Sequence, residues 1–187
     1  MRSALLSGAG AASAVLALPV AASAQDYVQP GFFYEVPASV EAGETDPSVL
    51  PTRIRQAAID TRSGSEGRIA GARIGDSDFY VVFLETTYGC GSGGCRAQIW
   101  EYNERGLKQH PSLPAGHLPI TMLPQEKNGK PSLGLTVSNE DVALVILPIT
   151  FGGTSYTEWD WTKLLPADSG QTLINARSLE PFTNKNK

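Results

Sequence analysis

Short apolar segments separated by turn-forming residues follow one another from about residue 63 to residue 165. Residues 79–87 are rich in β-branched and aromatic side chains, and residues 132–137 alternate polar and apolar side chains, so both are typical of strands. Asn128-Gly129 suits a two-residue hairpin turn. The pattern predicts strands over residues 68–74, 79–87, 96–102, 117–123, 132–137, 141–151 and 155–162, with 141–151 as a central strand.

One amphipathic helix precedes these strands. Asp46-Pro47 is a suitable helix start, and Leu50, Ile54, Ala57 and Ala58 form one apolar stripe. The sequence therefore predicts a single helix over residues 48–61. A series of strands with one helix before them predicts an α+β fold, in which an antiparallel sheet has one main helix packed on it. An all-β sandwich with a peripheral helix is the alternative.

The N-terminal residues are typical of a secretory signal peptide. Arg2 precedes an uncharged apolar run over residues 4–22, and Ala22-Ser23-Ala24 supplies the small residues of a cleavage site. We expect a signal peptide over residues 1–24, cleavage before Gln25 and a periplasmic mature protein. Residues 25–46 are expected to form an extended arm. Residues 47–187 are expected to form a single globular domain, whose last residues, of little periodicity from Pro166, end in a frayed tail.

Charge argues against a nucleic acid partner, and hydropathy argues against a membrane-spanning segment in the mature chain. The chain has 15 Lys and Arg against 19 Asp and Glu, a formal net charge of −4, and it contains no basic run. This balance argues against nucleic acid binding. No second apolar stretch is long enough to span a bilayer, so we expect no membrane span in the mature chain. The sequence does not indicate an oligomeric state.

Cys90 and Cys95, the only cysteines, enclose Gly91-Ser92-Gly93-Gly94. In an exported chain such a pair is expected to form a disulfide. A ring this small stabilises the fold by only about 2 kcal/mol, so shaping the hairpin tip is a better reason for the bond. The spacing differs from that of thioredoxin-type redox pairs, and with His110 and His117 it matches no standard zinc pattern. We predict no metal and no cofactor.

The residues around the disulfide combine features of a recognition loop. Glycine leaves backbone N–H groups uncovered, so the tip can donate hydrogen bonds to an anion or a carbonyl, or enter a narrow cleft. Tyr and Arg, which flank it, are frequent anchors of interfaces. The alternative is that the glycines only permit the tight ring. The predicted contact residues are Tyr88, Gly89, Gly91, Ser92, Gly93, Gly94 and Arg96.

Three segments around this loop carry a resemblance. Residues 80–84, the Cys-Gly-Ser-Gly-Gly-Cys block at 90–95 and residues 97–101 resemble an uncharacterised family of small exported proteins of Gram-negative bacteria. The resemblance extends over residues 66–165. It implies a periplasmic antiparallel α+β domain and supplies no catalytic residue.

The cysteine spacing is also similar to that of the periplasmic inhibitor of vertebrate lysozyme. That family displays a C-x4-C disulfide loop on a strand-rich scaffold, and the loop plugs the catalytic cleft of the enzyme. Its loop carries a histidine and charged residues, whereas residues 91–94 here carry neither. The similarity implies a loop that enters an enzyme cleft, with a lysozyme-like enzyme as the first target to test.

Catalytic groups are also considered, and each has a simpler explanation. Ser92 lacks the strand–turn–helix setting of a hydrolase nucleophile, and His110 and His117 are expected at the surface. Glu158 and Asp160 share one face of a predicted strand, as a glycosidase pair would, but a solvated strand face explains them more simply. Trp159 and Trp161 fall on the opposite face and are expected in the core, although exposed tryptophans can stack on sugars.

These observations predict a non-enzymatic binding or inhibitor module that acts through the disulfide-closed tip. The expected partner is a protein or glycan-processing enzyme of the cell envelope. A cell-envelope scaffold protein and a glycan or peptidoglycan hydrolase are the alternatives. Exposure of residues 88–96 distinguishes a binding function from a scaffold function, because a tip packed against the rest of the domain cannot contact a partner.

Overall fold

The computed structural model describes residues 50–62, 65–138 and 143–184. The expected signal peptide, the expected arm over residues 25–46 and the Asp46-Pro47 helix start lie outside these residues. In chain order the described elements are α1 (Thr52–Asp60), β1 (Glu66–Arg73), β2 (Phe79–Glu85), β3 (Cys90–Gly91), β4 (Gly94–Asn103), β5 (Gly106–His110), β6 (Ala115–Lys127), β7 (Lys130–Ser138), β8 (Leu144–Phe151), β9 (Tyr156–Trp159), β10 (Leu165–Pro166), β11 (Gln171–Ile174), the 3-10 helix η1 (Ala176–Ser178) and β12 (Glu180–Thr183).

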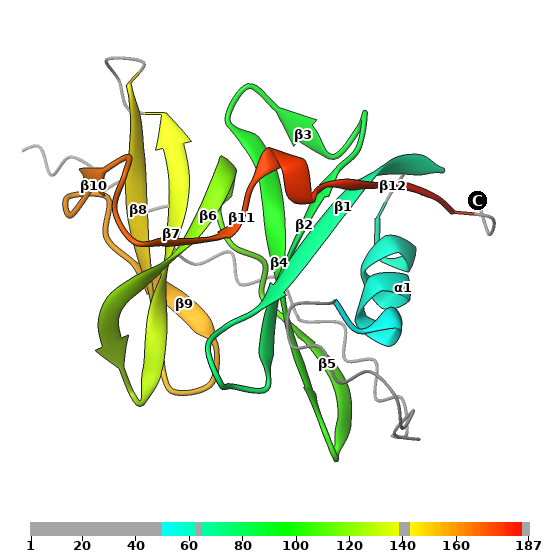
Figure 1. Cartoon of the computed structure of the whole chain (residues 1–187), viewed down its shortest axis with the longest axis horizontal. Coiled ribbons are helices and arrows are strands. Elements are labelled where there is room, and N and C mark those ends of the chain that lie inside the picture. The colour runs from blue at the N-terminus through cyan, green and yellow to red at the C-terminus, as the bar shows by residue number, and fades with distance from the viewer. Residues whose placement is uncertain (1–49, 63–64, 139–142, 185–187) are drawn as a thin grey trace, which may run out of the picture.

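The strands form two halves that meet at β4 and β6. The strand order is β10-β8-β7-β6-β4-β2-β1-β12, with β11 beside β6, β3 and β5 beside β4, and β9 beside β8. We call β12, β1, β2, β4 and β5 the first half, and β10, β9, β8, β7, β6 and β11 the second half (Figure 1). Every strand pair in the described part of the chain is antiparallel. Over the described residues the fold is therefore dominated by antiparallel sheet, with a single short α-helix, as the sequence predicts.

The main hydrophobic core lies between the two halves. Side chains from alternate positions of β2 and β4, such as Val81 and Ile99, meet side chains from alternate positions of β7 and β8, such as Leu135 and Leu147. All four are fully buried. The alternation follows from the two-residue period of a strand, which directs successive side chains to opposite faces.

Helix α1 covers the other face of the first half. Its apolar stripe, Ile54 and Ala58, packs with Val82, Leu84 and Trp100 in a second core. The predicted stripe is confirmed, but the described helix begins at Thr52, because Pro51 at the N-cap is extended, with ψ 134°. Strands β2 and β4 thus have apolar neighbours on both faces.

Several predicted strands are confirmed and two regions differ. The turn at Asn128-Gly129 is present, with φ 51° and 71°, and joins β6 to β7. Strand β8 is not central, because only the short strands β9 and β10 lie beyond it. The segment from residue 165 to 183 forms β10, β11, η1 and β12, although the sequence shows little periodicity there. Strand β11 pairs with β6 of the second half, and β12 pairs with β1 of the first half. The segment therefore crosses from one half to the other (Figure 1).

Two glycines allow the halves to meet. Where Cys95 and Arg96 of β4 pair with Gly116 and Ala115 of β6, the backbones approach closely. A Cβ atom on Gly94 would lie 1.9 Å from the carbonyl oxygen of Gly116, and Gly94 has a φ of +94°. Only glycine satisfies both conditions without strain.

We predict that Gly94→Ala destabilises the protein by about 2–5 kcal/mol, because a Cβ both overlaps the Gly116 carbonyl and strains the backbone. Denaturant unfolding of the mature protein measures the change. Gly93→Ala is the matched control: a Cβ there meets no atom within 4 Å, so its effect should stay within about 1 kcal/mol. Equal stability of the two variants would contradict the role given to Gly94.

Candidate functional site

The predicted disulfide between Cys90 and Cys95 is present and closes a short hairpin. Strand β3 pairs with the start of β4, with Cys90 opposite Cys95 and Gly91 opposite Gly94. The Cα atoms of the two cysteines are 4.3 Å apart. Ser92 and Gly93 form the turn between the paired residues. We call residues 88–96 the tip; β3 lies at one end of β4, and the β4–β5 turn lies at the other (Figure 1).

The base of the tip is anchored, whereas its end projects into solvent. Cys95 is 6% exposed and belongs to the core between the halves, and Cys90 packs against that core. By contrast, Tyr88 is 84% exposed, and Gly91, Ser92, Gly93 and Arg96 are also exposed. The disulfide therefore joins an exposed turn to the fixed interior of the fold.

The glycines of the tip fall into two classes. At Gly89 a Cβ would lie 2.3 Å from Thr86 Oγ1, and at Gly94 it would meet Gly116. Packing thus requires these two glycines. At Gly91 and Gly93 a Cβ meets no atom within 4 Å, and neither residue has a φ in the left-handed region. Neither packing nor backbone conformation requires glycine at these two positions.

Two arginines lie together beside the tip. The Nη2 of Arg62 donates a 2.6 Å hydrogen bond to the backbone carbonyl of Arg96. Gln98 Nε2 donates to Thr61 Oγ1 at 2.8 Å, which fixes the end of α1 against β4 and so places Arg62 there. Burial, together with the charge of Arg96, lowers the pKa of Arg62. The base of the tip therefore concentrates positive charge.

The candidate catalytic serine and histidines do not form a site. His110 is buried rather than at the surface: its Nε2 lies 3.0 Å from Glu101 Oε2, and its ring packs on Phe79. Burial lowers the pKa of His110, and the hydrogen bond with Glu101 opposes that effect. His117 is half-buried on β6. In the described part of the chain, no side-chain hydrogen bond links Ser92 to either histidine.

A second surface feature, absent from the sequence prediction, lies on the second half, on the face turned away from the core. It is an open groove of about 480 Å³, which we call the outer groove. Strands β6 to β10 supply its walls, together with the segment between β9 and β10. The lining residues are Leu123, Gln125, Lys127, Ser132, Pro148, Thr150, Glu158, Trp159, Asp160, Lys163 and Leu165.

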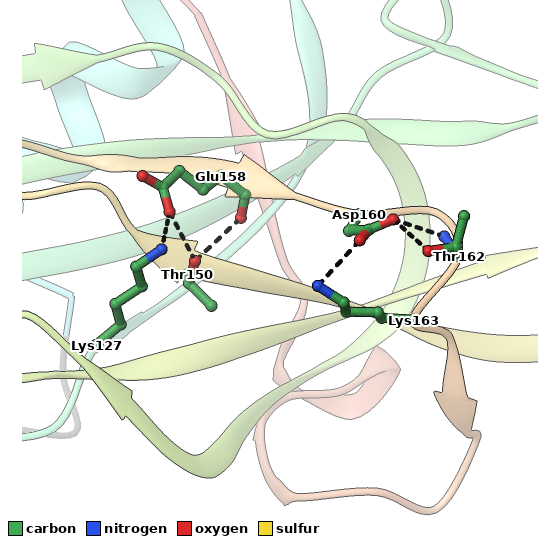
Figure 2. Close-up of polar contacts among 6 residues, drawn as sticks. All are labelled: Lys127, Thr150, Glu158, Asp160, Thr162 and Lys163. Carbon is green, nitrogen blue, oxygen red and sulfur yellow. Dashed lines mark hydrogen bonds and ion pairs between the residues drawn. The ribbon is translucent and has the colours of Figure 1, made fainter.

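The outer groove contains two lysine–carboxylate pairs, which Figure 2 shows. Lys127 Nζ donates to Glu158 Oε2, and Thr150 Oγ1 lies 3.4 Å from the same oxygen. Lys163 Nζ lies 3.1 Å from Asp160 Oδ2. Asp160 Oδ1 also accepts hydrogen bonds from the Thr162 hydroxyl at 2.6 Å and its backbone N–H at 2.9 Å. Both carboxylates are therefore held in fixed orientations.

These contacts keep both carboxyls charged. The hydrogen bond from Lys127 lowers the pKa of Glu158, and the contacts with Thr162, followed by Lys163, lower the pKa of Asp160 to about 2. A glycosidase of the common type needs one carboxylic acid that stays protonated near neutral pH. Neither Glu158 nor Asp160 has the raised pKa of such an acid.

Trp159 and Trp161 lie at the surface rather than in the predicted core. Trp159 is 41% exposed and lines the outer groove, and Trp161 is 51% exposed, whereas Trp100 is fully buried against α1. The prediction failed because it assumed an uninterrupted strand over residues 155–162. Strand β9 instead ends at Trp159, and its register with β8 shifts between Thr150 and Phe151, so strict alternation does not apply.

Comparison of the chain with protein-family models, with curated proteins and with solved structures gives no match. Among the described residues, no helix is long and apolar enough to cross a membrane. In the same residues, no group of three or more His, Cys, Asp or Glu side chains is placed to hold a metal ion.

We predict that the Asp160 carboxyl titrates with a midpoint at about 2. Because its pKa in the folded state is below the ordinary value of about 3.9, the ionised form persists until the pH falls through about 2. Carbon-detected NMR of side-chain carboxyls across acid pH measures the midpoint. Thr162→Ala, which removes the strongest donor, should raise it. A parent midpoint at the ordinary value, or no change in the variant, would contradict the assigned hydrogen bonds.

Proposed function

We propose that this protein is an exported, non-enzymatic binding module that contacts a protein partner through the tip. One observation carries the proposal: the exposed end of the tip is attached to the core by the disulfide, and neither packing nor backbone conformation requires its Gly91 and Gly93. Glycine at these positions narrows the tip and uncovers its backbone N–H groups. A narrow, rigid projection is suited to insertion into a cleft.

The disulfide and the buried Cys95 favour binding because they fix the tip before it meets a partner. Ordering a loop at an interface costs free energy, and a loop that is already ordered avoids most of that cost. Tyr88 and Arg96 stand exposed on either side of the ring. They are two of the three residue types that contribute most often to interface energy.

The charge at the base of the tip indicates what the partner presents. Arg62 and Arg96 place two positive charges close together. A partner with carboxylates in or beside an open cleft is complementary to them. Enzymes that cleave glycans commonly carry two carboxyl groups in such a cleft. A glycan-processing enzyme of the cell envelope therefore fits the tip in shape and in charge.

The class and location of the protein are part of the same proposal. We assign an α+β class, because α1 packs Ile54, Ala58 and Ile59 against the strands of the first half in a second core. We place the mature protein in the periplasm on the order of Arg2, the apolar run and Ala22-Ser23-Ala24.

N-terminal sequencing of the protein recovered from an exporting Gram-negative host tests the location. The expected first residue is Gln25, because the small residues before it match the requirement of a signal peptidase. The periplasmic fraction should contain the processed form. Recovery of a soluble cytoplasmic protein that retains Met1 would contradict export.

We predict that Tyr88→Ala and Arg96→Ala each weaken partner binding by about tenfold or more, as replacement of interface anchors does. The mature protein is immobilised, partners are captured from envelope extract, and vertebrate lysozyme is tested separately by binding and inhibition. Thermal melting should be nearly unchanged, because both side chains are exposed. Affinity for the recovered partner is then measured for each variant.

Arg105→Ala is the matched control. It removes an exposed arginine from the β4–β5 turn, at the opposite end of β4, and should bind as the parent does (Figure 1). If the tip variants also bind as the parent does, the tip is structural and the scaffold function replaces the proposed one. Failure to inhibit lysozyme removes only that enzyme as the partner.

A further inference from the structure

We infer that the outer groove is a binding site for an uncharged saccharide, which it holds without cleaving. The site shares no residue with the tip and lies on the second half of the fold, whereas the tip belongs to β3 and β4. It is therefore independent of the proposed function. Three observations support it: the size of the groove, its apolar surface and its balanced charges.

The groove has the size and apolar surface that a sugar ring requires. Its volume of about 480 Å³ lies within the range of small-molecule sites. Pro148 and Leu165, which are half-buried, supply aliphatic surface, and Trp159 supplies an aromatic ring that is 41% exposed. The C–H face of a pyranose is apolar, so it packs favourably on a partly exposed indole.

The polar groups of the groove are balanced in charge. Each carboxylate has its own lysine: Glu158 is paired with Lys127, and Asp160 with Lys163 (Figure 2). An anionic ligand would compete with the carboxylates for the lysines, and a cationic ligand would compete with the lysines for the carboxylates. An uncharged ligand leaves both pairs intact. Sugar hydroxyls both donate and accept, so they can use the free lone pairs of the carboxylates and the remaining N–H groups of the lysines.

The same geometry favours binding over hydrolysis. Both carboxyls are charged near neutral pH because their pKa values are lowered, so the groove offers no carboxylic acid to protonate a glycosidic oxygen. Their hydrogen bonds with Lys127, Thr150, Thr162 and Lys163 fix them as acceptors. The groove thus resembles a sugar-binding surface in chemistry and lacks the acid of a glycosidase.

Calorimetric titration of the full-length mature protein with neutral tetrasaccharides tests the inference. The probes are chitotetraose, cellotetraose and maltotetraose; tetragalacturonate, a chitosan tetramer and a tetra-alanine peptide test the other ligand classes. At least one neutral sugar should bind with a Kd of about 1 mM or tighter. The charged sugars and the peptide should bind more weakly, and the sugar should be recovered uncleaved.

Trp159→Ala is expected to weaken saccharide binding by about tenfold or more, as loss of an aromatic anchor does. Trp161→Ala is the matched control, because Trp161 is also exposed, at 51%, but does not line the groove; it should change the Kd less than about twofold. Lys163→Ala, which leaves Asp160 unpaired, should also weaken binding. Circular dichroism and melting confirm that each variant is folded.

Absence of binding by all neutral probes, preference for a charged sugar or the peptide, release of cleaved products, or equal effects of Trp159→Ala and Trp161→Ala would each overturn the inference. Failure of the tip proposal gives a different result. Arg96→Ala should leave saccharide binding unchanged, and Trp159→Ala should leave binding of a protein partner unchanged. The two sites can therefore be accepted or rejected separately.

Discussion

Strand β4 of the first half also pairs with β6 of the second half, and the remaining structure depends on this strand. Its first residues pair with β6 of the second half, and its later residues pair with β2 and β5 of the first half. The close approach of Gly94 to Gly116 makes this arrangement sterically possible. Strand β4 directs Ile99 into the core between the halves and Trp100 into the core beneath α1. It therefore lies between the helix and the second half.

The tip extends from the point where the two halves meet. Cys95 is part of the core and also pairs with Gly116, so the exposed turn is attached to the buried interior where the two halves meet. The outer groove depends on different contacts, chiefly the two lysine–carboxylate pairs and the segment between β9 and β10. One chain therefore offers a rigid projection suited to a protein cleft and, on its other half, a charge-balanced surface suited to a sugar.

The features that the sequence predicted correctly share one property: each depends on residues that are close together in the chain. The disulfide needs two cysteines at hairpin spacing, the Asn128-Gly129 turn needs left-handed backbone at adjacent residues, and Ile54 and Ala58 show a helical period. The features that the sequence predicted wrongly depend on partners that are distant in the chain. Strand β12 forms because β1 offers it an edge, and His110 is buried because Glu101 and Phe79 lie on neighbouring strands.

By itself, the sequence determined a largely antiparallel sheet, one helix with a single apolar stripe and a disulfide-closed glycine tip, because periodicity, turn chemistry and cysteine spacing act over a few residues. Only the tertiary structure decided which tip glycines are required, that Trp159 is exposed while Trp100 is buried, and that Lys127 and Lys163 neutralise Glu158 and Asp160. These features arise where strands distant in sequence meet at a particular register, and register is set by packing of the whole sheet rather than by any segment alone.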